Sequence, residues 1–315
     1  MLKISKISAL IFFFSCSLAA QNKQKIIFDC DIGGAIDDAY AIALLLCSPE
    51  FEILGIITDY GDTGKRAQVA CRLLYETGRD DIPVIVGRET GSDYDNQFRW
   101  ADGFNKISPQ KISAADFIIE NLKKYPGEII LFTVGPVPNI ADVLQKDPDV
   151  LKLAKRVVSM FGSFYMGYDG GSKPDAEWNV QVDVASSKML VASGARLTFA
   201  GLDITTFVRF NQSQLLRLLM RQSPLTNSLS SLYSLWQFED YAEPDPALFD
   251  VVAVGMVLWP ELFETKSVHV SVQDDGFTVV DEERAPNAEI GVKINENVFI
   301  ERVMERLIKQ NLGRN

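Results

Sequence analysis

The sequence predicts an α/β fold in which a mostly parallel central sheet is covered by helices on both faces. Short runs rich in β-branched and aromatic residues alternate with longer helix-like runs along the 315 residues. The strand-like runs are apolar almost throughout, which is typical of parallel strands buried on both faces. No internal repeat or low-complexity linker interrupts this alternation.

The first strand is expected over 25–28, followed by a turn at Gly33 and Gly34 and by a helix that starts near Asp37. Residues 39–47 are almost wholly apolar, so this helix should be buried. Further strands are expected at 52–58, 83–87, 128–134, 156–161 and 196–202, and further helices at 63–78, 113–124, 139–154, 183–193 and 245–258. The tail contains two strand-like runs, SVHVSV and EIGVKI, and then an amphipathic helix. Residues 21–315 are therefore expected to form a single domain.

Residues 1–20 have the pattern of a secretory signal peptide, with Lys3 and Lys6 near an apolar stretch and small residues ending at Ala20. An exported protein, periplasmic or extracellular, is expected. Cys16 follows Phe-Phe-Phe-Ser, which resembles a lipoprotein signal, so lipid anchoring at this cysteine is an alternative and the only membrane association expected. Cleavage removes two lysines and no acid, which moves the formal net charge from −11 to −13 and argues against a nucleic-acid partner.

The other three cysteines, Cys30, Cys47 and Cys71, fall on predicted core elements. An odd number there is typical of buried thiols and not of a disulfide framework. The only histidine, His269, lies in an alternating strand pattern and is expected to have a structural role.

The stretch IIFDCDIGGAIDDAYAI contains four carboxylates, Asp29, Asp31, Asp37 and Asp38. They fall at the carboxyl end of a strand and in the first turn of a helix, at the edge where open α/β sheets bind ligands. Helix capping would explain one or two of them. Like charges held this close raise one another's pKa unless a cation neutralises them, so a hard, oxygen-preferring divalent ion is the economical explanation.

A second acidic signal is Asp250 in DPALFDVVAVG, where Asp245 and Pro246 are expected to be the N-cap and the first residue of a helix. The helical neighbours of Asp250 are apolar, and an unpaired carboxylate buried there would be costly without a metal partner. The alternative is an exposed acid near a helix start.

Two further motifs are weaker signals. LFTVGPVPNIA is expected to be the end of a strand, a turn at Val134 and the start of a helix. Its backbone carbonyls could ligate a cation, but the motif on its own indicates only a turn. AEWN places Glu177 and Asn179 on either side of Trp178. An aromatic among hydrogen-bonding side chains suits a sugar or a base, but surface loops share this composition.

Together, these motifs resemble the inosine-uridine nucleoside hydrolase family. The first stretch looks like that family's amino-terminal aspartate cluster in its longer variant. VGPVPNIA, AEWN and LFDVVAV are similar to its middle, Glu-Phe-Asn and late helical segments, in the same order. The resemblance implies a Rossmann-like fold and a homo-oligomer. It also implies calcium-dependent hydrolysis of the N-glycosidic bond of ribonucleosides to free base and ribose.

The resemblance also implies individual roles. The calcium ligands would be Asp31, Asp38, Asp250 and the main-chain oxygen of Val134, and Asp31 would also take the proton of the attacking water. The substrate-binding residues would be Asp37, on a ribose hydroxyl, Glu177 and Asn179, on the outer hydroxyls, and Asp62, which stands where many members have Asn.

The acid that would protonate the leaving base is unassigned. Phe249 occupies the place where purine-active members of the family have a histidine for this step. Tyr233, Trp236 and Tyr241 are candidates for stacking on a base or donating to it, although helix packing explains each of them as well.

Two other classes of function stay open. IIFDCD also ends a strand in Asp-x-Asp, as in aspartate-nucleophile phosphatases, with Asp29 as the nucleophile. That class normally has Thr or Val where Gly33 stands, and it does not explain Asp37 and Asp38. The other class is a metal-dependent sugar or nucleoside binder without turnover, which the missing histidine would explain.

Overall fold

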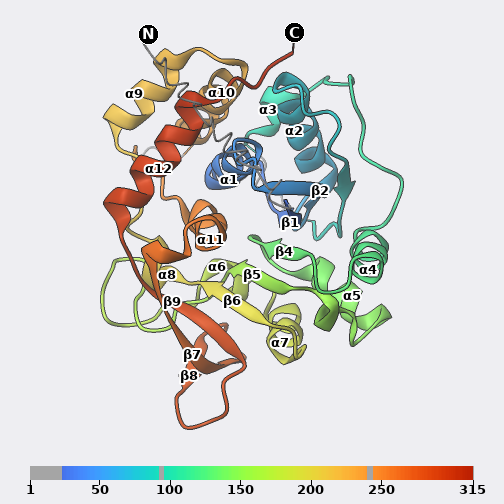
Figure 1. The fold of residues 1–315 in the computed structure, drawn as a ribbon, viewed down its shortest axis with the longest axis vertical. Coiled ribbons are helices and arrows are strands. Elements are labelled where there is room, and N and C mark those ends of the chain that lie inside the picture. The colour runs from blue at the N-terminus through green and yellow to red at the C-terminus, as the bar shows by residue number, and fades with distance from the viewer. Residues whose placement is uncertain (1–22, 92–95, 240–243, 315) are drawn as a thin grey trace, which may run out of the picture.

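The computed structural model describes residues 23–91, 96–239 and 244–314 (Figure 1). The predicted signal peptide, with Cys16, and the candidate Tyr241 lie outside the described residues. The described chain contains one sheet with the strand order β3-β2-β1-β4-β5-β6-β9-β7-β8. Its strands are β1 (Gln24–Cys30), β2 (Phe51–Thr58), β3 (Val84–Val86), β4 (Ile130–Thr133), β5 (Arg156–Met160), β6 (Leu197–Ala200), β7 (Phe263–Val272), β8 (Thr278–Asp281) and β9 (Ala288–Ile294).

The strands from β3 to β9 in this order pair in parallel, and β7 and β8 add an antiparallel edge. The predicted mostly parallel sheet is therefore confirmed. After β1 the chain builds the sheet toward β3, and from β4 onward it builds in the opposite direction. The strand order thus reverses between β1 and β4, and open α/β sheets bind their ligands at such a point.

Helices cover both faces of the sheet (Figure 1). One apolar core contains side chains of α1, α2, α10, α11 and α12, and a second contains side chains of α4, α5 and α7. The α-helices are α1 (Asp37–Leu46), α2 (Thr63–Glu76), α3 (Phe98–Ala101), α4 (Ala114–Lys124), α5 (Pro138–Lys146), α6 (Trp178–Gln181), α7 (Val184–Ala192), α8 (Leu202–Thr205), α9 (Gln212–Arg221), α10 (Pro224–Glu239), α11 (Phe249–Leu258) and α12 (Glu296–Lys309). The 3-10 helices are η1 (Val150–Leu153) and η2 (Pro260–Leu262).

Two predicted helix boundaries are wrong. The helix expected over 139–154 ends at Lys146, because Asp147 precedes Pro148 and takes an extended conformation that a following proline favours. The helix expected from Asp245 begins only at Phe249. Residues 245–248 instead pair with residues 208–210, since the amide of Phe210 donates to the carbonyl of Pro246.

The remaining expectations about the core agree with the structure. Every residue of α1 is buried, as predicted from its apolar sequence. Cys30 and Cys71 are buried free thiols, and Cys47 is a half-buried one. Within the described ranges, no helix combines the length and the apolar character that crossing a membrane requires.

Candidate active site

A cavity of about 480 Å³ opens at the carboxyl ends of β1, β4 and β5. Its lining includes all but one of the predicted site residues, namely Asp31, Asp37, Asp38, Val134, Glu177, Asn179 and Asp250. A larger hollow, of about 710 Å³, lies at the opposite edge, where Gln24, Ile130 and Arg156 begin their strands, and it contains none of these residues. The residues predicted from separate motifs therefore converge at the point where the strand order reverses.

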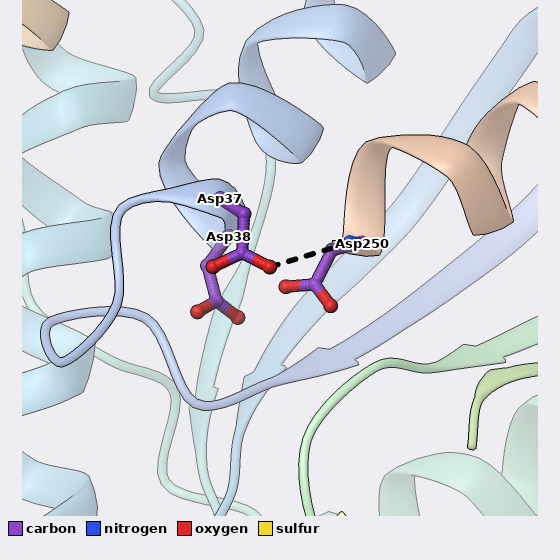
Figure 2. A group of neighbouring side chains, drawn as sticks. All are labelled: Asp37, Asp38 and Asp250. Carbon is purple, nitrogen blue, oxygen red and sulfur yellow. Dashed lines mark hydrogen bonds between the residues drawn. The ribbon is translucent and has the colours of Figure 1, made fainter. Parts of the chain in front are cut away.

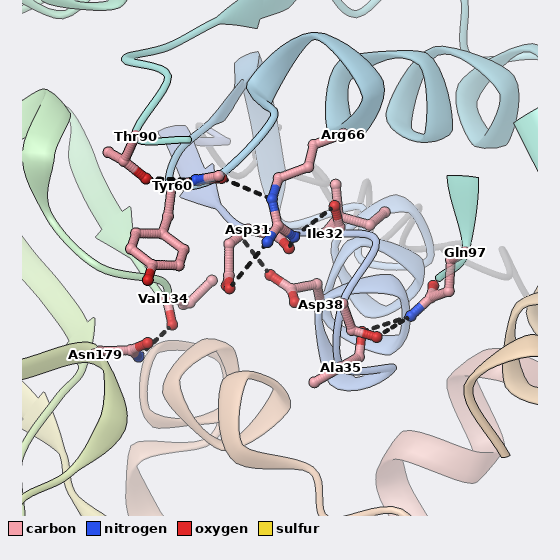
Figure 3. Close-up of polar contacts among 12 residues, drawn as sticks. Asp31, Ile32, Ala35, Asp38, Tyr60, Arg66, Thr90, Gln97, Val134 and Asn179 are labelled. Atoms are coloured by element: carbon pink, nitrogen blue, oxygen red, sulfur yellow. Dashed lines mark hydrogen bonds and ion pairs between the residues drawn. The ribbon is translucent and has the colours of Figure 1, made fainter. Parts of the chain in front are cut away.

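The turn between β1 and α1 is held in one shape by buried contacts. Gly33 has a φ of +113°, a conformation that side-chain-bearing residues rarely adopt. The side chain of Gln97 donates to the carbonyls of Gly34 and Ala35 at 2.8 and 2.7 Å (Figure 3). This turn places Asp31, at the end of the strand, and the first residues of α1 beside the same cavity.

Three buried carboxylates meet across two helices. Oxygen atoms of Asp37 and Asp38, from α1, and of Asp250, from α11, all lie within 4.8 Å of one another (Figure 2). The amide of Asp250 donates to Oδ2 of Asp37 at 3.3 Å. Asp250 is only 3% exposed, so the alternative of a solvent-exposed acid is wrong. A group of this kind could hold a metal ion.

The electrostatics of this carboxylate group favour a cation. Burial raises the pKa of Asp37 to about 7, and the nearby charge of Asp31 adds to the shift. The pKa values of Asp38 and Asp250 lie well above their usual range, first because of burial and then because of the neighbouring aspartates. A divalent ion would replace the protons that this group otherwise retains.

Asp31 lies next to this group without belonging to it. Its amide donates to Oδ1 of Asp38 at 3.2 Å, and its side chain lines the cavity. The carbonyl of Val134, the other implied ligand, accepts a hydrogen bond from Nδ2 of Asn179 at 2.8 Å. The compact group thus contains Asp37 where the resemblance implied Asp31, and the ligand set remains a prediction.

Arg66 is a buried cation that the sequence interpretation missed. Its side chain is 2% exposed, and its guanidinium donates to the carbonyls of Tyr60 at 2.7 Å and Ile32 at 3.1 Å, and also to that of Asp31 (Figure 3). Nη2 lies 3.9 Å from Oδ2 of Asp31. Arg66 therefore fixes the end of β1 and partly balances the negative charge. An arginine among the apolar neighbours Ala67, Val69 and Ala70 was the available signal.

Glu177 and Asn179 are rigidly held at the other side of the cavity. Glu177 caps α6, with Oε1 accepting from the amide of Asn179 at 2.9 Å and Oε2 accepting from that of Gly162 at 3.0 Å. Burial raises the pKa of Glu177 to about 7, although these backbone donors oppose the shift. Nδ2 of Asn179 donates to the carbonyls of Val134 and Met160. This leaves its Oδ1 to accept from a ligand hydroxyl.

The remaining predicted site residue, Asp62, and two of the aromatic candidates for base contact do not line the cavity. Asp62 is the N-cap of α2, where it accepts from the amide of Lys65 at 3.0 Å, so its role in substrate binding stays a prediction. Tyr233 donates its hydroxyl to the carbonyl of Pro244, and Trp236 packs in the apolar core.

Two further buried acids lie beneath the site. Asp29 is fully buried in β1 and accepts from Nδ2 of Asn139 at 2.8 Å, but it does not line the cavity. Neither oxygen of the buried Asp59 has a hydrogen-bond partner within the described residues. A phosphatase nucleophile must reach its substrate, so the burial of Asp29 argues against the phosphatase alternative.

Aromatic side chains form the remaining wall of the cavity. Tyr168, Trp178 and Phe249 all line it, and the rings of Tyr168 and Phe249 meet edge to face with their centroids 6.3 Å apart. A largely apolar aromatic wall beside fixed hydrogen-bond acceptors fits a base joined to a sugar. Tyr168 lies in a glycine-rich loop, and no spacing in the sequence had singled it out.

Residues 26–301 match the family model for inosine-uridine preferring nucleoside hydrolase. The chain belongs to this family. It is 29% identical to uridine nucleosidase 1 of Arabidopsis thaliana over 81% of this chain and 80% of that protein. It is 28% identical to a pyrimidine-specific ribonucleoside hydrolase of Citrobacter koseri, over 90% and 97% of the two chains.

Solved nucleoside hydrolases share the fold. A plant nucleoside hydrolase superposes with a TM-score of 0.80 at 24% identity, covering 91% of this chain and 99% of that one. A purine-preferring ribonucleoside hydrolase from Gardnerella vaginalis gives a TM-score of 0.79 at 22% identity, covering 90% and 98%. Membership of the nucleoside hydrolase family makes this protein a hydrolase of N-glycosyl bonds, which confirms the expected enzyme class.

Proposed function

We propose that the protein is a calcium-dependent ribonucleoside hydrolase that releases free base and ribose. The observation that carries the proposal is the convergence of three buried carboxylates, Asp37, Asp38 and Asp250, with Glu177 and Asn179 in one cavity. Carboxylates gathered around a sugar stabilise the oxocarbenium-like state through which a glycosidic bond breaks. The family membership supports the same bond type.

The donor atoms fit calcium. All the side-chain ligand atoms that this carboxylate group offers are oxygens, which hard divalent cations prefer over nitrogen or sulfur. We expect the ion to be held by Asp31, Asp38, Asp250 and the carbonyl of Val134, with Asp37 close beside them. When bound, such an ion lowers the pKa of a water molecule and binds vicinal hydroxyls.

The chain's own residues supply the remaining steps. Asp31 lines the cavity and accepts the proton of the attacking water. Asp37 accepts a hydrogen bond from a ribose hydroxyl, while Glu177 and Asn179 accept from the outer hydroxyls. Because backbone contacts already fix Glu177 and Asn179, little side-chain freedom is lost when the sugar binds.

Substrate, location and assembly complete the proposal. Uridine is the first substrate to test, since two of the relatives are named for uridine or for pyrimidine ribonucleosides. Export directed by residues 1–20, with or without a lipid at Cys16, is supported by the sequence pattern. A homo-oligomer is supported by the resemblance to the family.

The test is to incubate the purified protein with a panel of nucleosides and a phosphate ester, with and without a chelator. Base, ribose and phosphate are then assayed. The expected result is base release that the chelator abolishes and added calcium restores. Phosphate release would instead support a phosphatase, and thermal stabilisation by calcium without any turnover would support a binding protein.

A further inference from the structure

The wall that would face the base has few hydrogen-bond donors. Among the described residues that line the cavity, Phe249, Met160 and Ala35 have none in their side chains, and both hydrogens of the Asn179 amide are used internally. Apart from the carboxyl groups, the side-chain donors that remain are the hydroxyl of Tyr168 and the indole N–H of Trp178. A departing base gains negative charge and needs such a donor.

Tyr168 is 41% exposed, yet it is fixed at both backbone and side chain. Its amide donates to Oδ2 of Asp175 at 2.8 Å, and its carbonyl accepts from Oγ1 of Thr206 at 2.8 Å. Its ring packs edge to face against the ring of Phe249. Its hydroxyl oxygen accepts a hydrogen bond from the amide of Trp178 at 2.9 Å. A surface tyrosine held in this way is preorganised to contact a ligand.

The hydroxyl hydrogen of Tyr168 is not committed. The Tyr168 oxygen accepts a hydrogen bond from the Trp178 amide. No side chain or carbonyl in the described parts of the chain accepts a hydrogen bond from the Tyr168 hydroxyl. Partial burial of the Tyr168 side chain raises its pKa, and the nearby charge of Glu177 raises it further. The group therefore stays protonated at neutral pH and acts as a hydrogen-bond donor without giving up its proton.

We propose that the hydroxyl of Tyr168 donates a hydrogen bond to the departing base, the contact that Phe249 cannot provide. The inference rests on the proposed function. When the C1′–N bond breaks, its electron pair stays on the base, and the hydrogen bond from Tyr168 stabilises that charge. The water oxygen bonds to C1′, Asp31 takes a proton from the water, and the base takes its proton from solvent.

The test compares Tyr168→Phe with the unchanged protein on uridine and on 4-nitrophenyl riboside. Nitrophenolate is a stable anion that leaves without a hydrogen bond, and both substrates contain the same sugar. We expect kcat on uridine to fall about ten- to hundredfold and kcat on the nitrophenyl riboside to stay within about twofold. Phenylalanine retains the ring that packs on Phe249, and a thermal melt checks that the variant is folded.

Tyr165→Phe is the matched control. It removes a phenolic hydroxyl from the same loop, but this hydroxyl donates to Oε1 of Glu282 at 3.0 Å and Tyr165 does not line the cavity. Both rates should be unchanged in this variant. Equal loss on both substrates in Tyr168→Phe would assign the hydroxyl to the sugar, and no loss on either would remove it from the reaction. Either of these two results overturns the inference. If the protein without any substitution cleaves no nucleoside, the proposed function itself is overturned.

Discussion

Replacing Arg66 by methionine tests whether a buried cation holds the end of β1 beneath the carboxylates. Methionine is unbranched and apolar, but it leaves the carbonyls of Tyr60, Asp31 and Ile32 without their donors. Removing one partner from a buried charged network costs about 3–5 kcal/mol. We expect the free energy of unfolding to fall by about that amount, because the side chain of Arg66 is only 2% exposed.

The matched control lies on the same helix. Arg72 pairs with Glu76 at 3.5 Å and stacks over the ring of Trp100, with its side chain 31% exposed. A partly exposed pair and a cation–π contact each contribute about 1 kcal/mol or less. Arg72→Met should therefore cost clearly less than Arg66→Met.

Urea denaturation at pH 7 with saturating calcium measures both variants, and uridine turnover is followed on the folded fraction. The folded Arg66→Met protein should turn over slowly, since Asp31 loses the contacts that position it. An Arg66→Met variant within about 1 kcal/mol of the unchanged protein, or no less stable than Arg72→Met, would refute the reasoning.

Three further predictions concern the cavity. At a calcium concentration of a hundred times Kd, the unchanged protein should gain about 2.7 kcal/mol of stability. Asp250→Asn should abolish this stabilisation, whereas the control Asp245→Asn should keep it. An equal stabilisation in both variants would contradict the ligand assignment. Because the pKa of Glu177 is raised from 4.5 to about 7, its folded form retains a proton that the unfolded chain has lost, so stability falls as pH rises through this window. In chelator, Glu177→Gln should reduce the loss of stability between pH 5 and 8 by about 2 kcal/mol, and identical pH profiles in urea titrations would exclude this. Gly135→Ala would place a methyl 2.5 Å from Oδ1 of Asp59 and 2.8 Å from Oδ1 of Asp31, so one or both carboxylates must shift. We expect kcat to drop at least about tenfold, and full activity would show that Asp31 either keeps its place or tolerates displacement.

The sequence predicted the elements whose signals are local. The apolar runs located the parallel strands, and Asp37 and Asp38 could be assigned to the first turn of a buried helix from the residues that follow them. Asp250 was predicted to join them only through the order of motifs, because 213 residues separate it from Asp37. The end of α5 at Lys146 was predicted wrongly, although the proline two residues later is a local signal for it.

The rest depends on tertiary contacts. Arg66 reaches carbonyls 34 and 35 residues earlier in the chain, and no helical periodicity indicates such a reach. Tyr168 owes its position to Asp175, Thr206 and Phe249, which come from three different parts of the fold. Asp62 was predicted to bind substrate, and in the structure it caps α2. The sequence alone does not distinguish an aspartate that caps a helix from one that binds a ligand.

The ligands of the proposed ion come from early, middle and late parts of the polypeptide. A cation bound by both α1 and α11 would join carboxylates that are 213 residues apart in the chain. Because the unfolded chain does not hold these groups together, the ion would stabilise the folded state alone. Chelation would therefore lower the free energy of unfolding of the domain, while α1 and α11 stay packed through their buried apolar side chains.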